Sequence, residues 1–215
     1  LTLVAEKMSK GRIFIAGDAA HLFTPTGGLG YNTAIEDVVN LGWKLAAVIN
    51  GWGGAGLLGS YHPERQPAAV RNTNYARGFA DSLGNFKADP RLEEDSDEGA
   101  KLREIAGEHY GNHGRSEFNI PGITFGTRYD GSPVIVGDGS APPPDQANVY
   151  EPSACPGGRA PHLWFDLETD VPVSLYDRFG YEFTLLTLDG HRAESVAEIQ
   201  EEAIKEKKKQ IQHIS

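Results

Sequence analysis

The spacing of apolar residues predicts the elements of the first part of the chain. Ile13 to Ala16 is a short apolar run of the kind that makes a buried strand. Gly17-Asp18 follows and is expected to stop the strand, so that a carboxylate stands at its end. After a glycine-rich loop, apolar residues recur at helical spacing from Ala34 to Ile49, and Asn50-Gly51 is typical of a helix end. The pattern predicts the order strand, acid, glycine-rich turn, helix.

Helical spacing continues further along, with interruptions. The run Gly51–Gly56 predicts a flexible break. Residues Arg65 to Leu83 are expected to form more helix, in which Pro63 and Pro67 force a kink or a restart. The acids between Asp89 and Lys101 lack the spacing of a calcium loop, so this stretch is predicted to be a solvated loop or a helix start.

The histidines do not indicate a metal site. His109 and His113 stand four residues apart, but Gly111 and Gly114 make a stable helix there doubtful. The other histidines show no metal-binding spacing, so no metal is expected. His21 is interpreted as a positioned polar residue rather than as a base.

From residue 120 the chain changes character. Ile123–Gly126 and Pro133–Val136 read as short strands, and Asp138–Asp145 reads as a linker stiffened by proline. Further on, the pattern predicts a charged amphipathic helix over Glu194–Gln212.

The glycine-rich loop has properties that suit a cofactor. Gly27, Gly28 and Gly30 lack a β-carbon, so the backbone there can approach a ligand closely and can adopt positive φ. The start of the helix behind them carries unsatisfied N–H groups and a partial positive charge. The acid before the loop, Asp18, can accept hydrogen bonds from sugar-alcohol hydroxyls. The alternative is a strand-to-helix turn that is merely capped by glycines.

These residues carry a resemblance to a known family. Gly17-Asp18-Ala19-Ala20-His21, followed by Pro25-x-Gly-Gly-x-Gly-x-Asn32 and Asp37-x-x-Asn40-Leu-x-Trp-Lys-Leu45, resembles the second flavin-binding motif of class A FAD-dependent aromatic hydroxylases. The resemblance implies that Asp18 binds the ribityl chain of FAD and that Gly17 allows close approach. It also implies that a group of backbone amides lies near the pyrimidine edge of the flavin, namely those of Gly28, Leu29, Gly30, Tyr31 and Asn32. Pro25 would sit beside the substrate ring, and no catalytic side chain is identified.

A further segment fits the same family. Tyr61-His-Pro-Glu64-Arg65-Gln-Pro67 is similar to its Tyr-x-x-Glu-Arg-x-Pro segment, in which the acid and the arginine lock this helix to the flavin domain. Glu64 and Arg65 are therefore interpreted as structural rather than catalytic.

Other parts of the family pattern do not occur in the sequence. There is no Gly-x-Gly-x-x-Gly turn for the ADP half of FAD, and the mid-chain Asp-Gly motif is missing as well. The chain is therefore expected to be the C-terminal part of a longer enzyme. Without a partner layer, the apolar faces of Ile13–Ala16 and Ala34–Leu45 are expected to be exposed.

The end of the chain resembles another part of the same family. Pro156-Gly-Gly-Arg159-Ala-Pro-His162 is similar to the segment that introduces a thioredoxin-like domain, here incomplete. The resemblance implies that Ser174–Gly180 forms the short helix of that domain and Phe183–Leu188 its buried strand. Cys155 stands alone, so the Cys-x-x-Cys chemistry of thioredoxin is excluded.

The predicted fold class is therefore mixed α/β (α+β). The C-terminal part of a Rossmann-like FAD-binding domain with long helices (1–118) is followed by a connecting segment and linker (119–157) and by a partial thioredoxin-like domain (158–215).

The composition of the chain argues against some classes of binding partner and indicates a cellular compartment. The net charge of −10 and the isoelectric point of about 5.1 argue against nucleic acid or an anionic membrane as a partner. No apolar run approaches the roughly 20 residues of a membrane helix. The lone cysteine is compatible with a reducing compartment, and a cytoplasmic location is expected.

The activity implied by the resemblance is hydroxylation of a phenolic or other aromatic substrate. NAD(P)H would reduce FAD, and the reduced flavin would react with O₂ to give a C4a-hydroperoxide that transfers oxygen. The partners would be a small aromatic substrate and O₂, and assembly into a homo-oligomer stays open. Two alternatives remain: a non-catalytic interaction module that needs a partner chain, and, more weakly, a flavin-dependent halogenase.

Overall fold

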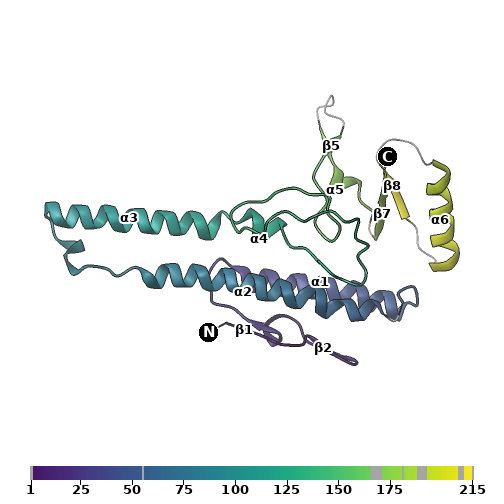
Figure 1. Cartoon of the computed structure of the whole chain (residues 1–215), viewed down its shortest axis with the longest axis horizontal. Coiled ribbons are helices and arrows are strands. Elements are labelled where there is room, and N and C mark those ends of the chain that lie inside the picture. Colours follow the sequence, from purple (N-terminus) through teal and green to yellow (C-terminus); the bar gives the residue numbers. More distant parts are fainter. Residues whose placement is uncertain are drawn as a thin grey trace.

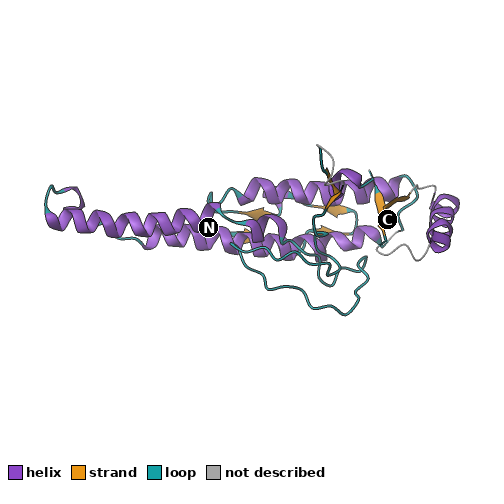
Figure 2. Ribbon diagram, turned by 90° about the horizontal axis from the view of Figure 1, so that it is seen from above, coloured by secondary structure: helices purple, strands orange, loops and turns teal. Residues whose placement is uncertain are grey.

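Long helices dominate the computed structural model, which describes residues 2–54, 56–165, 171–180, 182–187, 193–207 and 211–214. Helix α1 spans Leu29–Ile49, α2 spans Tyr61–Asn85 and α3 spans Asp97–Phe118. α1 and α2 lie side by side, and α2 and α3 form a long hairpin that makes the molecule elongated (Figure 1, Figure 2). Within the described residues, no helix combines the length and apolar character that a membrane span requires.

Short strands and short helices complete the described residues. The strands pair antiparallel as β1 (Leu3–Val4) with β4 (His21–Leu22), β2 (Ser9–Lys10) with β3 (Ile13–Phe14), and β5 (Trp164–Phe165) with β6 (Val173–Ser174). β7 (Phe183–Leu186) pairs parallel with β8 (Ile211–Ile214). Three short 3₁₀ helices are present among the described residues: η1 (Gly17–Ala19), η2 (Leu57–Ser60) and η3 (Pro90–Glu93). Two short α-helices, α4 (Pro121–Phe125) and α5 (Leu175–Arg178), and the longer α6 (Ala193–Lys207) follow along the chain. This mixture confirms the mixed helix and strand character of the predicted fold class, and the thioredoxin-like part stays a prediction.

The strand predicted over Ile13–Ala16 is shorter and more exposed than expected. It ends at Phe14, and Ile13 is 70% exposed. The hairpin partner, Ser9–Lys10, is polar and supplies no apolar layer to cover it. The expectation of a buried strand is therefore wrong for this chain, whereas the expectation of an unpartnered apolar face is confirmed.

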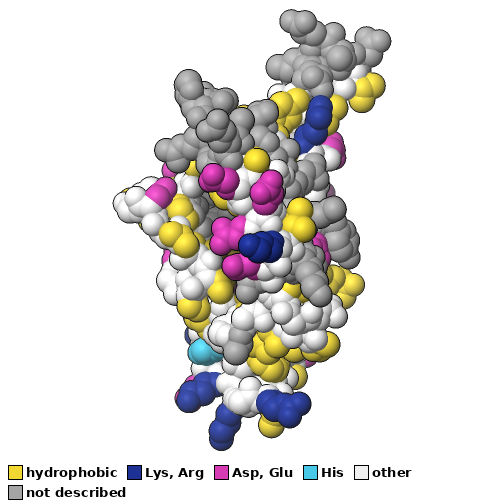
Figure 3. Space-filling view, turned by 90° about the vertical axis from the view of Figure 1, so that its right-hand side faces the viewer, with side chains coloured by type: hydrophobic (Ala, Val, Ile, Leu, Met, Phe, Trp, Pro, Cys, Tyr) yellow, Lys and Arg dark blue, Asp and Glu magenta, His cyan; other side chains and the backbone are white. Residues whose placement is uncertain are grey.

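Helix α1 buries its polar stripe and exposes its apolar stripe. The buried positions are mostly polar or charged, and the exposed ones include Val38 at 61%, Val39 at 65% and Ile49 at 80%. Exposed hydrophobic side chains are also visible at the end of the molecule shown in Figure 3. A solvated apolar stripe of this length is unusual for a soluble protein and indicates a surface built to be covered.

Two predicted interruptions of helices do not occur. α2 runs without a restart, because Pro63 lies in its first turn, where N–H groups have no helical acceptor, and Pro67 is accommodated inside the helix. α3 continues through Gly111 and Gly114, although each glycine costs about 1 kcal/mol relative to alanine. Capping by the Ser96 hydroxyl and packing against α2 stabilise it.

The segment between residues 120 and 160 is mostly irregular. The strand predicted over Ile123–Gly126 is wrong, because these residues lie in α4 and at its C-cap, and Pro133–Val136 forms a turn and coil. Apolar runs this short do not distinguish helix from strand. Asp138–Asp145 has no regular structure, as predicted, and Asp145 ties it to α2 through an ion pair with Arg71 at 2.7 Å.

The last elements form a β–α–β unit. The short helix and the strand predicted there are present as α5 and β7, except that residue 188 lies outside the described residues. The helix predicted over Glu194–Gln212 ends at Lys207 instead, residues 208–210 are outside the description, and β8 follows. One more strand is therefore present than expected. The Phe183 ring lies 6.5 Å from that of Trp43 and 5.8 Å from that of Trp52, so the unit contacts the end of α1.

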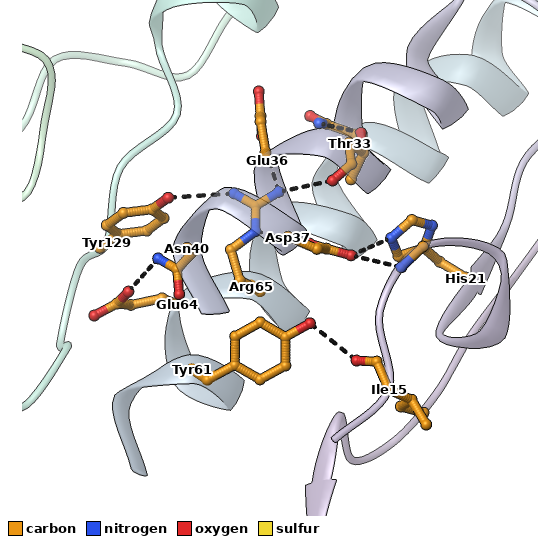
Figure 4. A network of polar contacts seen from close by, with 12 residues as sticks. Ile15, His21, Thr33, Glu36, Asp37, Asn40, Tyr61, Glu64, Arg65 and Tyr129 are labelled. Carbon is orange, nitrogen blue, oxygen red and sulfur yellow. Dashed lines mark hydrogen bonds and ion pairs between the residues drawn. The ribbon is translucent and has the colours of Figure 1, made fainter. Parts of the chain in front are cut away.

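A buried network of charges joins α1 to α2 (Figure 4). The Arg65 side chain is fully buried and donates to Asp37 at 2.8 Å, to Glu36 at 2.9 Å and to the Thr33 carbonyl at 3.3 Å. Burial alone would raise the pKa of Asp37, but hydrogen bonds from His21 and Arg65 outweigh it and hold that pKa below its ordinary value. A charged carboxylate therefore lies at the centre of the interface.

A second buried pair extends this network. Lys44 of α1 donates to Glu64 of α2, which also accepts from Asn40 at 2.6 Å and from Ser132 at 2.7 Å. Burial alone would raise the pKa of Glu64, but Lys44, Ser132 and Asn40 hold it below its ordinary value. Glu64 and Arg65 both hold helices together, which agrees with their structural interpretation.

We expect Asp37→Asn to destabilise the fold by about 3–5 kcal/mol, because it leaves the Arg65 guanidinium buried without its carboxylate. The measurement is urea unfolding followed by circular dichroism. Asp81→Asn is the control, because its ion pair with Arg77 is exposed and long at 3.7 Å. That change should stay within about 0.5 kcal/mol. Equal effects of the two substitutions would contradict the network's role.

The contribution of Asp37 should also depend on pH. A carboxyl group whose pKa is lower in the folded state stabilises the fold above its unfolded pKa, and loses that effect as pH falls through the folded pKa. The unfolded pKa is near the ordinary value of 3.8. Wild type should therefore lose more stability than Asp37→Asn when pH is lowered past that value. Parallel stability curves for the two proteins in acid would argue against a charged Asp37.

Candidate functional site

The turn that carries Asp18 is fixed onto helix α1. Gly17 is buried at φ +60°, and its amide donates to Asp37 Oδ2 at 3.1 Å. A β-carbon on Gly17 would lie 3.2 Å from that of Ala34, so the close approach requires glycine here. Asp18 itself is exposed, and no described residue forms a hydrogen bond or ion pair with its carboxylate. The turn presents a free carboxylate from a rigid base.

The start of α1 leaves its amides open. Gly27 and Gly28 both adopt left-handed conformations, at φ +66° and +64°, and Gly28 is the N-cap residue without a side-chain cap. The first helical turn, Leu29 to Tyr31, has no acidic side chain, so α1 itself supplies no counter-charge to its free N–H groups. The Glu117 carboxylate of α3 binds the amide of Gly27, which precedes these groups. Asn32 donates to the Gly28 carbonyl at 2.8 Å and closes the turn from the exposed side. Such a helix start suits an anionic group.

The back of the glycine loop is held by other helices. The Leu29 side chain is buried with Ala76, Phe79 and Ile123. The Thr26 hydroxyl donates to the Ala76 carbonyl at 2.6 Å. The loop is therefore packed on one side, which leaves the backbone of its other side to face outward.

The three glycines of the loop serve different purposes. A β-carbon on Gly28 would meet nothing within 4 Å, so the space in front of it is open. A β-carbon on Gly30 would instead lie 3.3 Å from Phe23, and one on Gly27 would lie 3.2 Å from Phe79. Gly28 is thus the position with room for a ligand, and Gly27 and Gly30 admit neighbouring aromatic rings.

The remaining residues predicted for the site lie on the exposed part of this segment. Pro25 and Asn32 are exposed, and Tyr31 is 77% exposed. The structure thus gathers the residues from Pro25 to Asn32 in one loop and helical turn, and anchors the Asp18 turn on the same helix.

His21 points toward Asp37 and the buried network rather than toward solvent (Figure 4). Its side chain is fully buried, and Nε2 lies 2.7 Å from Asp37 Oδ2. The ring stands edge-on to Phe23 with 5.2 Å between centroids. This placement agrees with the interpretation of His21 as a positioned residue.

Sequence reasoning missed residues that hold the site from a distance. Asp37 supports the Gly17 turn, and Glu117 of α3 accepts the Gly27 N–H at 2.7 Å. Asp37 belongs to the quoted motif, and its place in the polar stripe of α1 could have revealed it. Nothing near Glu117 in the sequence points to a loop that lies 90 residues earlier.

A hollow lies over the start of α2. Its volume is about 180 Å³, and its lining includes Arg71, Arg128, Asp130 and Asp145. Both arginines already pair with carboxylates, at 2.7 Å and 3.4 Å. The hollow offers less free charge to a ligand than the start of α1. Among the described residues, no cluster of three His, Cys, Asp or Glu side chains could hold a metal ion.

Flavin-binding proteins are among the known proteins that this chain is similar to. Residues 2–76 match the family model FAD_binding_3, an FAD binding domain. The FAD-dependent monooxygenase apdD of Emericella nidulans is 39% identical over 185 residues, which cover 82% of this chain and 29% of that protein. Phenol 2-monooxygenase of a Pseudomonas species is 36% identical over 203 residues, covering 85% of this chain and 33% of that protein.

Solved structures agree with these relatives. The rebeccamycin biosynthetic enzyme RebC with reduced flavin matches with a TM-score of 0.80 at 36% identity, over 98% of this chain and 38% of that one. The flavin-dependent monooxygenase PieE in complex with FAD and substrate matches with a TM-score of 0.77 at 29% identity, over 98% of this chain and 39% of that one. The chain thus spans about a third of the length of its curated relatives. Residues 2–76 thus match the FAD binding domain family, and the chain is similar over most of its length to one part of proteins named FAD-dependent monooxygenases.

Proposed function

We propose that this chain supplies the ribityl and isoalloxazine side of the FAD site in a monooxygenase that hydroxylates a phenolic or other aromatic substrate. The observation that carries the proposal is the pairing of a free Asp18 carboxylate with an uncapped helix start, both anchored on α1. The relative named phenol 2-monooxygenase supports the substrate class.

The residues of the site have distinct roles in this proposal. Asp18 accepts hydrogen bonds from the ribityl hydroxyls. The amides from Gly28 to Asn32 face the pyrimidine edge, where the positive end of α1 stabilises the negative charge of the reduced ring. Pro25, exposed at the front of the loop, contacts the substrate.

FAD would supply the oxygen-activating chemistry, with NAD(P)H as the reductant. One atom of O₂ enters the aromatic ring, and the other leaves as water with two electrons from NAD(P)H and protons. The contribution of the protein is to bind, orient and exclude water. No described side chain is required as a redox group.

A second candidate is an interaction module that binds flavin only with a partner chain. The exposed apolar stripe of α1 favours it. Weak FAD binding by the chain alone, with an affinity that depends on Asp18, would support the first candidate. No binding of FAD at any concentration until a partner chain is added would support the second.

Asp18→Ala should weaken FAD binding by about 1–3 kcal/mol, because a charge-assisted hydrogen bond is lost. Asp18→Asn keeps a hydrogen-bond acceptor and should lose less. Binding is measured by titrating FAD and following its absorbance. Asp95→Ala, an exposed acid on the loop before α3, is the control and should leave affinity unchanged. Unchanged affinity in Asp18→Ala would remove Asp18 from the site.

Gly28→Val should weaken flavin binding directly, in addition to any loss of folding stability that the substitution causes. A β-branched residue at φ +64° carries strain of order 1–3 kcal/mol, and its side chain also fills the open space before the helix. Gly51→Val is the matched control, since Gly51 has φ +78°, equally open surroundings and a place at the other end of α1. Both variants should lose similar stability, but only Gly28→Val should lose flavin. Full flavin binding by Gly28→Val would contradict the proposed site.

The chain by itself should bind FAD weakly, show no NAD(P)H oxidation and self-associate. Its exposed apolar stripe favours association, because burying that surface removes it from water. Light scattering measures the mass, and Val38→Lys/Val39→Lys should shift it toward the monomer. Ile105→Lys, at a position on α3 that is 58% exposed, is the control. A monodisperse wild-type monomer with tight FAD and substrate-stimulated NADPH oxidation would contradict this prediction.

A further inference from the structure

A carboxylate from α3 reaches the glycine loop. Glu117 is only 8% exposed, and its Oε1 accepts the Gly27 N–H at 2.7 Å. Its Oε2 lies 2.6 Å from Nε2 of His113, one helical turn earlier on α3. His113 is also buried, and its Nδ1 has no hydrogen-bond partner among the described residues. The His113 ring is thus held in this network through Nε2, toward Glu117.

The position of Glu117 disfavours a charged carboxylate. It sits in the last turn of α3, where the negative end of the helix repels a carboxylate, and it is nearly removed from water. Its contacts offset that cost. The amide of Gly27 immediately precedes the N-cap of α1, at the positive end of that helix. A carboxylate from the end of one helix thus meets the start of another.

The glycine loop needs such a contact. Two successive left-handed glycines, Gly27 and Gly28, have no side chains to fix the orientation of their peptide planes. The hydrogen bond from Gly27 to Glu117 selects one orientation of the peptide between Thr26 and Gly27. Packing of Phe79 against Gly27 restricts the same region from the side of α2. With Gly27 turned back toward α3, the next amides along the chain are left to face outward.

We propose that Glu117 is a positioning residue for the flavin loop: through Gly27 it sets the direction of the amides that follow, and His113 orients it. This role rests on the proposed function, because the ligand of those amides is the pyrimidine edge of FAD. α3 is therefore part of the flavin-binding apparatus, although it lies outside residues 2–76 that match the FAD binding domain family.

The sequence offers a probe that reads this contact alone. Thr26-Gly27 is the only Thr-Gly pair in the chain. Protein labelled with ¹³C-carbonyl threonine and ¹⁵N-glycine therefore gives one carbonyl-correlated amide peak, that of Gly27. The peak reports the hydrogen bond to Glu117 whether or not flavin is bound. The variants are Glu117→Ala, Glu117→Gln and, as the control, Glu108→Ala, an exposed acid on the same helix.

In Glu117→Ala the Gly27 proton should move upfield, and FAD affinity should fall about tenfold, as expected for one lost hydrogen bond. Glu117→Gln keeps an acceptor and should restore both, and Glu108→Ala should change neither. Thermal unfolding of each variant confirms that the fold persists. An unmoved Gly27 peak, or unchanged FAD affinity in Glu117→Ala, overturns the inference. Failure of the wild-type chain to respond to FAD overturns the proposed function instead, while the peak still tests the contact.

Discussion

The Asp37 carboxylate is the contact on which the rest of this structure depends. One of its oxygens binds Arg65 of α2, and the other receives His21 and the Gly17 amide. The same group thus fixes α1 against α2 and fixes the Asp18 turn against α1. Burying a charge is costly unless its partners are well placed, and here the partners come from two parts of the chain, the Gly17–His21 segment and α2. Stability and the geometry of the site are consequently linked through one residue.

This arrangement also explains why α1 buries polar side chains and exposes apolar ones. Charged and polar residues of α1 face α2 because α2 offers Arg65, Glu64 and Asn72 in return. The apolar residues of α1 are left on the opposite side, without cover in this chain. The two curated relatives are about three times as long as this chain.

Local features were predictable from the sequence where a short motif determines them. The Gly17-Asp18 turn, the glycine loop and the helix after them follow from residue types whose backbone preferences are strong. Short apolar runs such as Ile123–Gly126 were predicted as strands and are not, because their pattern fits either structure. The helix through Gly111 and Gly114 was doubted because its tertiary support from α2 cannot be seen locally. The contact of Glu117 with Gly27 was beyond prediction, since it joins residues 90 positions apart.

The central claim is that the Asp18 turn and the start of α1 together form one face of a flavin site. The most direct test is to titrate isotope-labelled chain with FAD and to map which backbone amides shift in the NMR spectrum. The account predicts shifts at Asp18 and from Gly28 to Asn32, with little change around Arg71 and Asp145 at the hollow over the start of α2. Shifts confined to that hollow, or none at all at concentrations that cover weak binding, would contradict it.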